Sequence, residues 1–443
     1  MGLEQMAMSG VAAVGRHRRV ADALFHFTKW GNPFADERFS WPYPMYDRMR
    51  ADGPVTYGRP YRQWFVFGYD EVQEVLRSPH TATAPVGELL LSTSRYRQLT
   101  PTARSNFARW LLINDAPDHT RLRAAVSRAF TPRQIDGYEP LISQAVGDLV
   151  DELDTPREID IVEAFTTRLP IQSIAAILGL PLDRRQWLLD ASREIGGMLE
   201  PLTPFDADSM SQRFAELDSY FRTVIAERRD QPGLDLISAL AATDDGHDLD
   251  DDEIVAMIAF LVFAGHETVT GMLGNALVAL ARHPDQRTLV RGNPDLIENA
   301  VEELLRFDPP AQVSGRQATA DFEVGGVTIR RGDNIGLMIG AANRDKRRWT
   351  DADELRLDRP DPRSISFGFG AHHCLGAALA RLQLHITLPP LLDALGDYTI
   401  EPGRIVWKRS FALRGPTSLL LTPHASARHT DPDINIETGP PPI

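Results

Sequence analysis

The chain has 443 residues and a formal net charge of −14, from 47 basic and 61 acidic residues. This acidic excess argues against a general nucleic-acid-binding protein, because the phosphate backbone would be repelled. A single cysteine excludes an intrachain disulfide and a four-cysteine zinc or iron–sulfur site, and it fits a reducing cytoplasm. The hydrophobic content of 43% and the charged content of 24% are typical of a soluble globular protein.

The two ends of the chain differ in composition from the middle. In residues 1–40 the weakly apolar Met6–Val14 precedes the basic Arg16–Arg19, the reverse of a signal peptide, so an N-terminal arm is predicted. Residues 423–443 are polar and end in prolines, which predicts a disordered tail. The longest apolar run, residues 254–265, is shorter than the roughly 20 residues of a membrane span. We therefore expect one cytoplasmic domain over 41–422 with no membrane span.

The beginning of this domain mixes helix and strand. Tyr43–Arg50 is predicted to be a helix, Trp64–Gly68 a strand, and Asp70–Arg77 a helix capped by Asp70. From Ser78 to Asn106 no firm periodicity occurs, which predicts a long loop. The apolar residues of this loop fit a pocket lining and a surface loop with core anchors equally well.

Helical periodicity dominates from Pro117 to about Arg306. The predicted helices are Arg121–Phe130, Arg133–Leu153, Asp183–Met198, Ser209–Arg229, Leu234–Ala242 and the long apolar Asp251–Arg282. Phe322–Ile329 is predicted to be a hairpin with a Gly-Gly turn, and residues 343–366 to be irregular. The sequence therefore predicts a mainly α fold, a helical domain with small β-sheets.

The only cysteine lies in a glycine-rich stretch, Phe367-Gly368-Phe369-Gly370-Ala371-His372-His373-Cys374-Leu375-Gly376, that ends where a helical pattern begins. A thiolate at a helix N-terminus lies beside unpaired N–H groups and the positive end of the dipole, which lowers its pKa. From these residues Cys374 is a metal ligand, such as an axial thiolate on haem iron, or a nucleophile, or a buried structural cysteine. As a haem ligand it would have Phe367 to exclude water and Gly368 to allow the tight backbone.

Two further motifs carry chemistry. Glu303 and Arg306 lie on one helical face and can pair, and Arg359 is the expected third partner if the pair is buried rather than exposed. In Ala264-Gly265-His266-Glu267-Thr268, the threonine is expected to bond the Ala264 carbonyl, and Gly265 costs about 1 kcal/mol in a helix. The hydroxyl and carboxylate suit proton delivery, whereas the plain alternative is a packing glycine beside a surface glutamate.

Together these motifs resemble those of the bacterial-type cytochrome P450 family, over about Trp41 to Thr422. The resemblance implies the cytochrome P450 fold and heme b (iron protoporphyrin IX) ligated through Cys374. It also implies that Ala264, Gly265 and Gly376 lie against the haem, and that the propionates are bound by His119, Arg123, Arg316 and His372. His266 and His373 are assigned to packing or surface.

The resemblance further implies a haem-thiolate monooxygenase that inserts one oxygen atom from O2 into a lipophilic small molecule, with Glu267 and Thr268 as proton donors. Alternatives are a peroxide-driven haem peroxygenase and a non-catalytic haem-binding sensor. Electrons would come from a separate ferredoxin with its NAD(P)H-dependent reductase, and a monomer is expected. A basic patch that steers the ferredoxin is predicted from Arg109, Arg121, Arg128 and Arg381. The predicted substrate pocket consists of Val86, Leu89, Leu90, Met198, Phe260, Phe263, Val313, Phe411 and Ala412.

Overall fold

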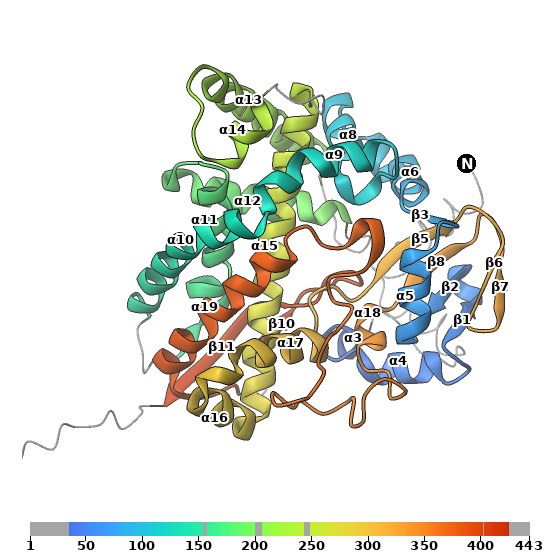
Figure 1. Cartoon of the computed structure of the whole chain (residues 1–443), viewed down its shortest axis with the longest axis vertical. Helices are drawn as coiled ribbons and strands as arrows, with labels where there is room; N and C mark the ends of the chain where they lie inside the picture. The colour runs from blue at the N-terminus through green and yellow to red at the C-terminus, as the bar shows by residue number, and fades with distance from the viewer. Residues whose placement is uncertain (1–34, 154–156, 200–205, 243–248, 402, 425–443) are drawn as a thin grey trace, which may run out of the picture.

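The computed structural model describes residues 35–153, 157–199, 206–242, 249–401 and 403–424. Most of the predicted N-terminal arm and nearly all of the predicted tail lie outside these residues. Helices fill one side of the molecule, and small sheets and irregular chain fill the other (Figure 1). The prediction of a mainly α fold with small sheets is confirmed.

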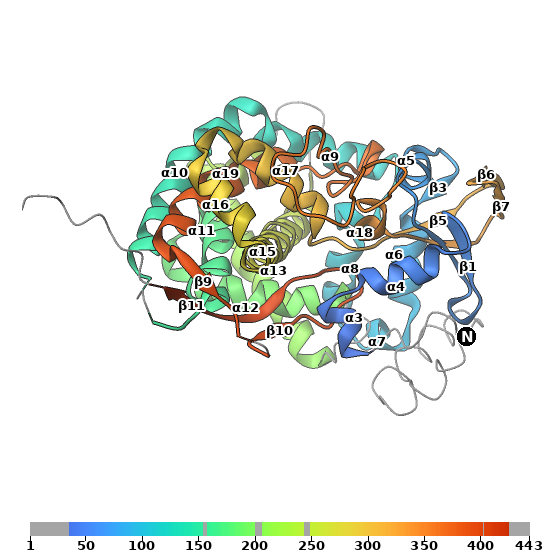
Figure 2. The same cartoon turned by 90° about the horizontal axis from the view of Figure 1, so that it is seen from below.

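The helical side surrounds α15 (Asp251–Arg282), which Figure 2 shows nearly end-on. Around it pack α8 (Pro101–Ala108), α11 (Arg168–Ile177), α12 (Arg185–Gly196), α13 (Ala207–Asp230), α14 (Leu236–Ala241), α16 (Pro284–Gly292), α17 (Ile297–Phe307) and α19 (Ala377–Leu395). Helix α10 (Pro132–Asp151) packs along α19, and α9 (Asp118–Ser127) precedes it.

Helix α15 begins with a capping box, in which Asp250 accepts from the Glu253 N–H and Glu253 accepts from the Asp250 N–H. It is long and apolar enough to cross a membrane, but 72% of its most apolar window is buried in the protein. It is therefore the central helix of a core.

The sheet side is built from three small sheets. The largest has the order β1 (Val55–Gly58), β2 (Gln63–Val66), β8 (Asn334–Leu337), β5 (Ser314–Ala318) and β3 (Thr81–Ala82). The others are the hairpin of β6 (Phe322–Val324) and β7 (Val327–Ile329), and β11 (Pro416–His424) with β10 (Ile405–Trp407), β4 (Ile159–Asp160) and β9 (Asp397–Thr399). The short helices on this side are α3 (Asp36–Ser40), α4 (Tyr43–Arg50), α5 (Tyr69–Arg77) and α18 (Ile339–Ala342). The predicted hairpin is confirmed, with Gly325 and Gly326 in the turn at positive φ.

Two local predictions were wrong. Asp70 is not a cap, because α5 begins at Tyr69 and its first N–H donates to the Asp345 carboxylate (2.9 Å), which comes from far along the chain. The stretch 78–106 is not a loop, because it contains α6 (Ala84–Ser92), α7 (Ser94–Arg97) and α8. Helix α6 presents apolar residues all round, so its sequence shows no helical period.

The chain that leads into β11 crosses α15 at two glycines. A Cβ on Gly271 would lie 2.7 Å from the Arg414 carbonyl oxygen, and a Cβ on Gly415 would lie 2.6 Å from the Gly271 Cα. Neither position can hold a side chain without moving the backbone. The crossing fixes the chain just before it, Ala412 and Leu413, against the middle of α15.

Candidate functional site

A cavity of about 380 Å³ lies between α15 and the cysteine loop, residues 367–376. Phe263, Ala264 and Thr268 line it from α15, and Phe367 and Cys374 line it from the loop. The cavity thus brings together the two motifs that are more than a hundred residues apart in the sequence.

The cysteine loop has a backbone that only glycine allows at two positions. Gly368 and Gly370 have φ of +67° and +72°, and a Cβ on Gly370 would lie 2.6 Å from the Leu76 carbonyl oxygen. The loop closes on itself, because the Cys374 N–H donates to the Phe367 carbonyl (2.8 Å). The thiol is thereby held at the cavity wall, just before α19 begins.

Burial raises the pKa of the Cys374 thiol, although the Gly376 N–H and the positive charges of Arg123 and Arg381 act in the opposite direction. The sequence-based expectation of a lowered pKa is therefore wrong for the thiol by itself. The thiolate loses more hydration in this site than the helix N-terminus returns. A metal ion bound at the sulfur reverses the balance, because it deprotonates a coordinating thiol outright.

Basic side chains gather at one end of the cavity. His119 is buried and its Nε2 has no hydrogen-bond partner, while its ring lies 4.1 Å from the ring of His372. Burial, followed by the positive charges of His372 and Arg123, lowers the pKa of His119 to about 4. Burial likewise lowers the pKa of Arg316 to about 10. These groups need a negatively charged partner in the cavity.

Asp115, which no local pattern singles out, also lies at this end. Its carboxylate accepts from the N–H groups of Thr83 (2.8 Å) and Ala84 (2.7 Å) and lies 3.3 Å from His372 Nε2. Burial opposes ionisation of Asp115, but these hydrogen bonds together outweigh it and hold its pKa well below the usual range. Asp115 therefore joins the start of α6 to the basic cluster.

The α15 motif has the local geometry that its sequence indicates. Thr268 Oγ1 donates to the Ala264 carbonyl (2.8 Å), and a Cβ on Gly265 would lie 3.4 Å from Ile174 Cδ1, so the glycine permits close approach of α11. Glu267 does not line the cavity. Its carboxylate pairs instead with Lys408 Nζ, a partner 141 positions along the chain that sequence reasoning missed.

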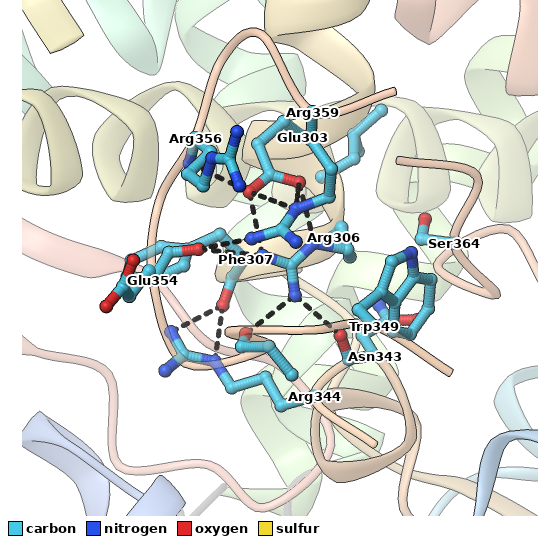
Figure 3. A network of polar contacts seen from close by, with 12 residues as sticks. Glu303, Arg306, Phe307, Asn343, Arg344, Trp349, Glu354, Arg356, Arg359 and Ser364 are labelled. Carbon is cyan, nitrogen blue, oxygen red and sulfur yellow. Dashed lines mark hydrogen bonds and ion pairs between the residues drawn. The ribbon is translucent and has the colours of Figure 1, made fainter. Parts of the chain in front are cut away.

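Glu303, Arg306 and Arg359 form one buried network (Figure 3). Arg306 donates to both Glu303 oxygens (2.6 and 2.7 Å), and Arg359 Nε donates to the same carboxylate (3.0 and 3.1 Å). The remaining guanidinium N–H groups donate to backbone carbonyls of the irregular segment 343–366. Each charge is paired and hydrogen-bonded, which offsets the cost of its burial.

The structure separates the predicted substrate pocket into two groups. Phe260, Phe263, Val313 and Ala412 line the cavity. The other five predicted residues, Val86, Leu89, Leu90, Met198 and Phe411, do not.

Physical reasons account for the five. Met198 is only 1% exposed and belongs to the main core, so its neighbour Leu199 lines the cavity instead. Phe411 lines a smaller cavity and packs on Phe39 (ring centroids 5.7 Å apart). The residues from 86 to 90 lie on α6 rather than on a loop.

The family model described as Cytochrome P450 matches residues 59–396. The chain belongs to the cytochrome P450 family. This P450 is 37% identical to "Cytochrome P450 109" of Bacillus spizizenii, over 80% of this chain and 84% of that protein. It is 32% identical to the biotin biosynthesis cytochrome P450 of Bacillus subtilis, over 86% and 96%.

Among solved structures, it superposes on P450BioI in complex with an acyl carrier protein that carries hexadec-9Z-enoic acid, with a TM-score of 0.81 and 31% identity over 88% of this chain and all of that one. The corresponding values for CYP109E1 of Bacillus megaterium in complex with corticosterone are 0.76, 29%, 88% and 100%. Membership of the family makes the chain a P450 monooxygenase whose cofactor is heme b, held through a cysteine thiolate. The cavity fits this group, because Cys374 faces it and the unpartnered His119 Nε2 lies at its basic end.

Proposed function

We propose that this P450 hydroxylates or epoxidises a lipophilic small molecule, with one oxygen atom taken from O2. The observation that carries the proposal is the cavity, which has Cys374 on one wall, Thr268 on α15 and apolar side chains between them. When bound, haem supplies dioxygen activation and the oxidation itself. The protein supplies the ligand, the protons and the shape of the pocket.

Cys374 would bind the iron through Sγ. The propionates would lie at the basic end, where His119, Arg123, Arg316 and His372 are positioned to donate to them. Arg123 already donates to the His373 carbonyl (2.7 Å), which ties this donor to the cysteine loop. The negative charge that these side chains lack in the protein alone would be provided by the two carboxylates of the cofactor.

Proton delivery would use Thr268 and Glu267. The Thr268 hydroxyl lines the cavity and donates to the Ala264 carbonyl, so rotation about χ1 lets it donate into the cavity instead. Glu267 precedes it on α15 and is held by Lys408 outside the cavity. A proton from Glu267 would therefore reach Thr268 through a water molecule or after the carboxylate leaves Lys408.

The substrate is proposed to be lipophilic because the cavity wall opposite the cysteine is apolar, with Phe260, Phe263, Val313 and Ala412 on it. The titles of the solved relatives name a long-chain acyl group and a steroid as their ligands. Long-chain acyl compounds and steroids are accordingly the first two classes to test by titration, with displacement of water from the ferric iron read as a spin-state shift.

The electrons would come from a separate ferredoxin and its NAD(P)H-dependent reductase in the cytoplasm, since the sequence contains no flavin or nicotinamide fingerprint. The predicted basic patch receives little support as a source of steering. Arg109 pairs with Asp252, Arg121 with Glu253 and Arg381 with Glu302, so three of its four positive charges are compensated locally.

The deciding experiment compares turnover of one substrate with ferredoxin, reductase and NAD(P)H against turnover with hydrogen peroxide. A monooxygenase gives product from the first mixture, and Thr268→Ala lowers product per NAD(P)H while the carbon monoxide complex keeps its thiolate-type Soret band. Product only with peroxide would instead identify a peroxygenase, and no product in either mixture from a substrate that shifts the spin state would favour a sensor. Cys374→Ser should abolish the thiolate-type band.

A further inference from the structure

Asn343 lies directly after α18 and is fully buried. Its side-chain amide makes two hydrogen bonds to the segment that enters the cysteine loop. Oδ1 accepts from the Ile365 N–H (2.9 Å), and Nδ2 donates to Ser366 Oγ (2.8 Å). An amide offers a donor and an acceptor in one plane, so no other side chain of this size makes both bonds.

The same residue is tied to the buried charge network. Arg306 donates from Nη1 to the Asn343 carbonyl (2.9 Å), and Ser366 Oγ donates to the Leu305 carbonyl (2.7 Å) on the same helix, α17. Asn343 and Ser366 therefore connect α17 to residues 365 and 366 by two routes. Figure 3 shows Asn343 below Arg306 in this arrangement.

The connection continues to the thiol through the backbone. The Gly368 N–H donates to the Ile365 carbonyl (2.9 Å), and the Cys374 N–H donates to the Phe367 carbonyl (2.8 Å). Ile365 is fully buried, and Ser366 lines the cavity beside Phe367. Each step from Arg306 to Cys374 is a hydrogen bond or a covalent neighbour.

We propose that Asn343 is a positioning residue for the haem ligand: its amide carries the rigidity of the Glu303–Arg306 network into the cysteine loop and so fixes the direction of Cys374 Sγ. The inference rests on ligation of haem by Cys374. Without the amide, the Ile365 N–H and Ser366 Oγ each lose a partner in the interior, and the loop relaxes to recover one. A displaced sulfur is a poorer thiolate ligand and is more readily protonated.

The test uses the haem-bound full chain and the ferrous carbon monoxide complex. In urea below the unfolding transition, the rate at which the thiolate-type Soret band gives way to the thiol-type band is measured for wild type, Asn343→Ala and Ser366→Ala. Thermal unfolding is recorded for each protein. Asn343→Ala should convert about tenfold faster than wild type, as expected for loss of a buried hydrogen-bonded group, and Ser366→Ala should change in the same direction.

Asn299→Ala is the matched control. Asn299 lies on α17 and its Nδ2 also donates to the irregular segment, to the Leu357 (2.6 Å) and Arg359 (3.0 Å) carbonyls, but it makes no bond to residues 365–374. Its loss should lower thermal stability and leave the conversion rate at the wild-type value. Equal conversion rates for Asn343→Ala and wild type, or equal acceleration by the Asn299 and Asn343 variants, would overturn the proposal.

The inference also survives a variant that fails to fold. If Asn343→Ala yields no protein, Ser366→Ala removes one link only, and its conversion at the wild-type rate would count against the route. Absence of a thiolate-type band from the wild-type chain would overturn the ligation by Cys374 itself, and is therefore distinct from a failure of the Asn343 variant alone.

Discussion

His266 should make the stability of this P450 fall as the solution is acidified. Its side chain is 2% exposed, Nδ1 lies 2.9 Å from Ser192 Oγ, and Nε2 has no hydrogen-bond partner. Burial lowers its pKa to about 4; nearby Glu267 opposes this shift, while Arg193 and Lys408 add to it. We expect His266→Asn to keep the bond to Ser192, since the amide takes the place of Nδ1, and to remove the titrating group.

The size of the effect follows from the two pKa values, 6.5 for the ordinary group and about 4 in the fold. Below the higher value the unfolded chain takes up a proton that the folded protein refuses until the lower one. Stability is therefore complete above the ordinary pKa and is lost as the pH falls through this window, by about 3 kcal/mol in total. Between about pH 7 and about pH 5 the loss should be roughly 2 kcal/mol.

The assay is urea unfolding of the haem-bound protein at these two pH values. His266→Asn costs some stability at both, because it leaves a small void, but the difference between the two should shrink by roughly 2 kcal/mol relative to wild type. The exposed His80 provides the control, and His80→Gln should retain the wild-type difference. An unchanged pH dependence in His266→Asn would refute the assignment of a buried neutral imidazole.

Two further substitutions test the site's framework, each with a neighbouring control. Glu303→Gln should lower the free energy of unfolding by about 3–5 kcal/mol, because it leaves two buried guanidinium groups without their carboxylate, whereas Glu302→Gln, which breaks a partly exposed pair, should cost less than about 1 kcal/mol; urea titration measures both. Gly370→Ala should reduce haem content and stability, because φ is +72° and the new Cβ meets backbone, whereas Gly376→Ala meets open space; equal haem content in the two variants would contradict this.

Helix positions with strong local signals could be predicted from the sequence. Tyr43–Arg50 and Asp251–Arg282 were predicted with their observed boundaries, because each is marked by caps or breakers within the same stretch. Helix α6 was missed because three successive leucines lie on a short helix whose faces are all half-buried or buried. A periodicity argument fails when a helix packs on every side.

The residues of the site divide in the same way. Cys374, Thr268 and the Glu303 pair belong to local motifs with dense patterns, and the sequence indicates them. Lys408 and Asn343 carry no local signal, because each acquires its role from a partner far away in the chain. Their environment exists only after α15, α17 and the irregular segment have come together, so one sequence cannot reveal it.

The contact between Gly271 and Gly415 has a consequence for protein engineering. With no side chain between the two backbones, the spacing between α15 and the Ala412 side of the cavity is set by van der Waals contact. A library that varies Phe260, Val313 and Ala412 should reshape the cavity while this frame keeps its dimensions. Selection for new substrates in this P450 therefore acts on side-chain volume within walls of constant separation.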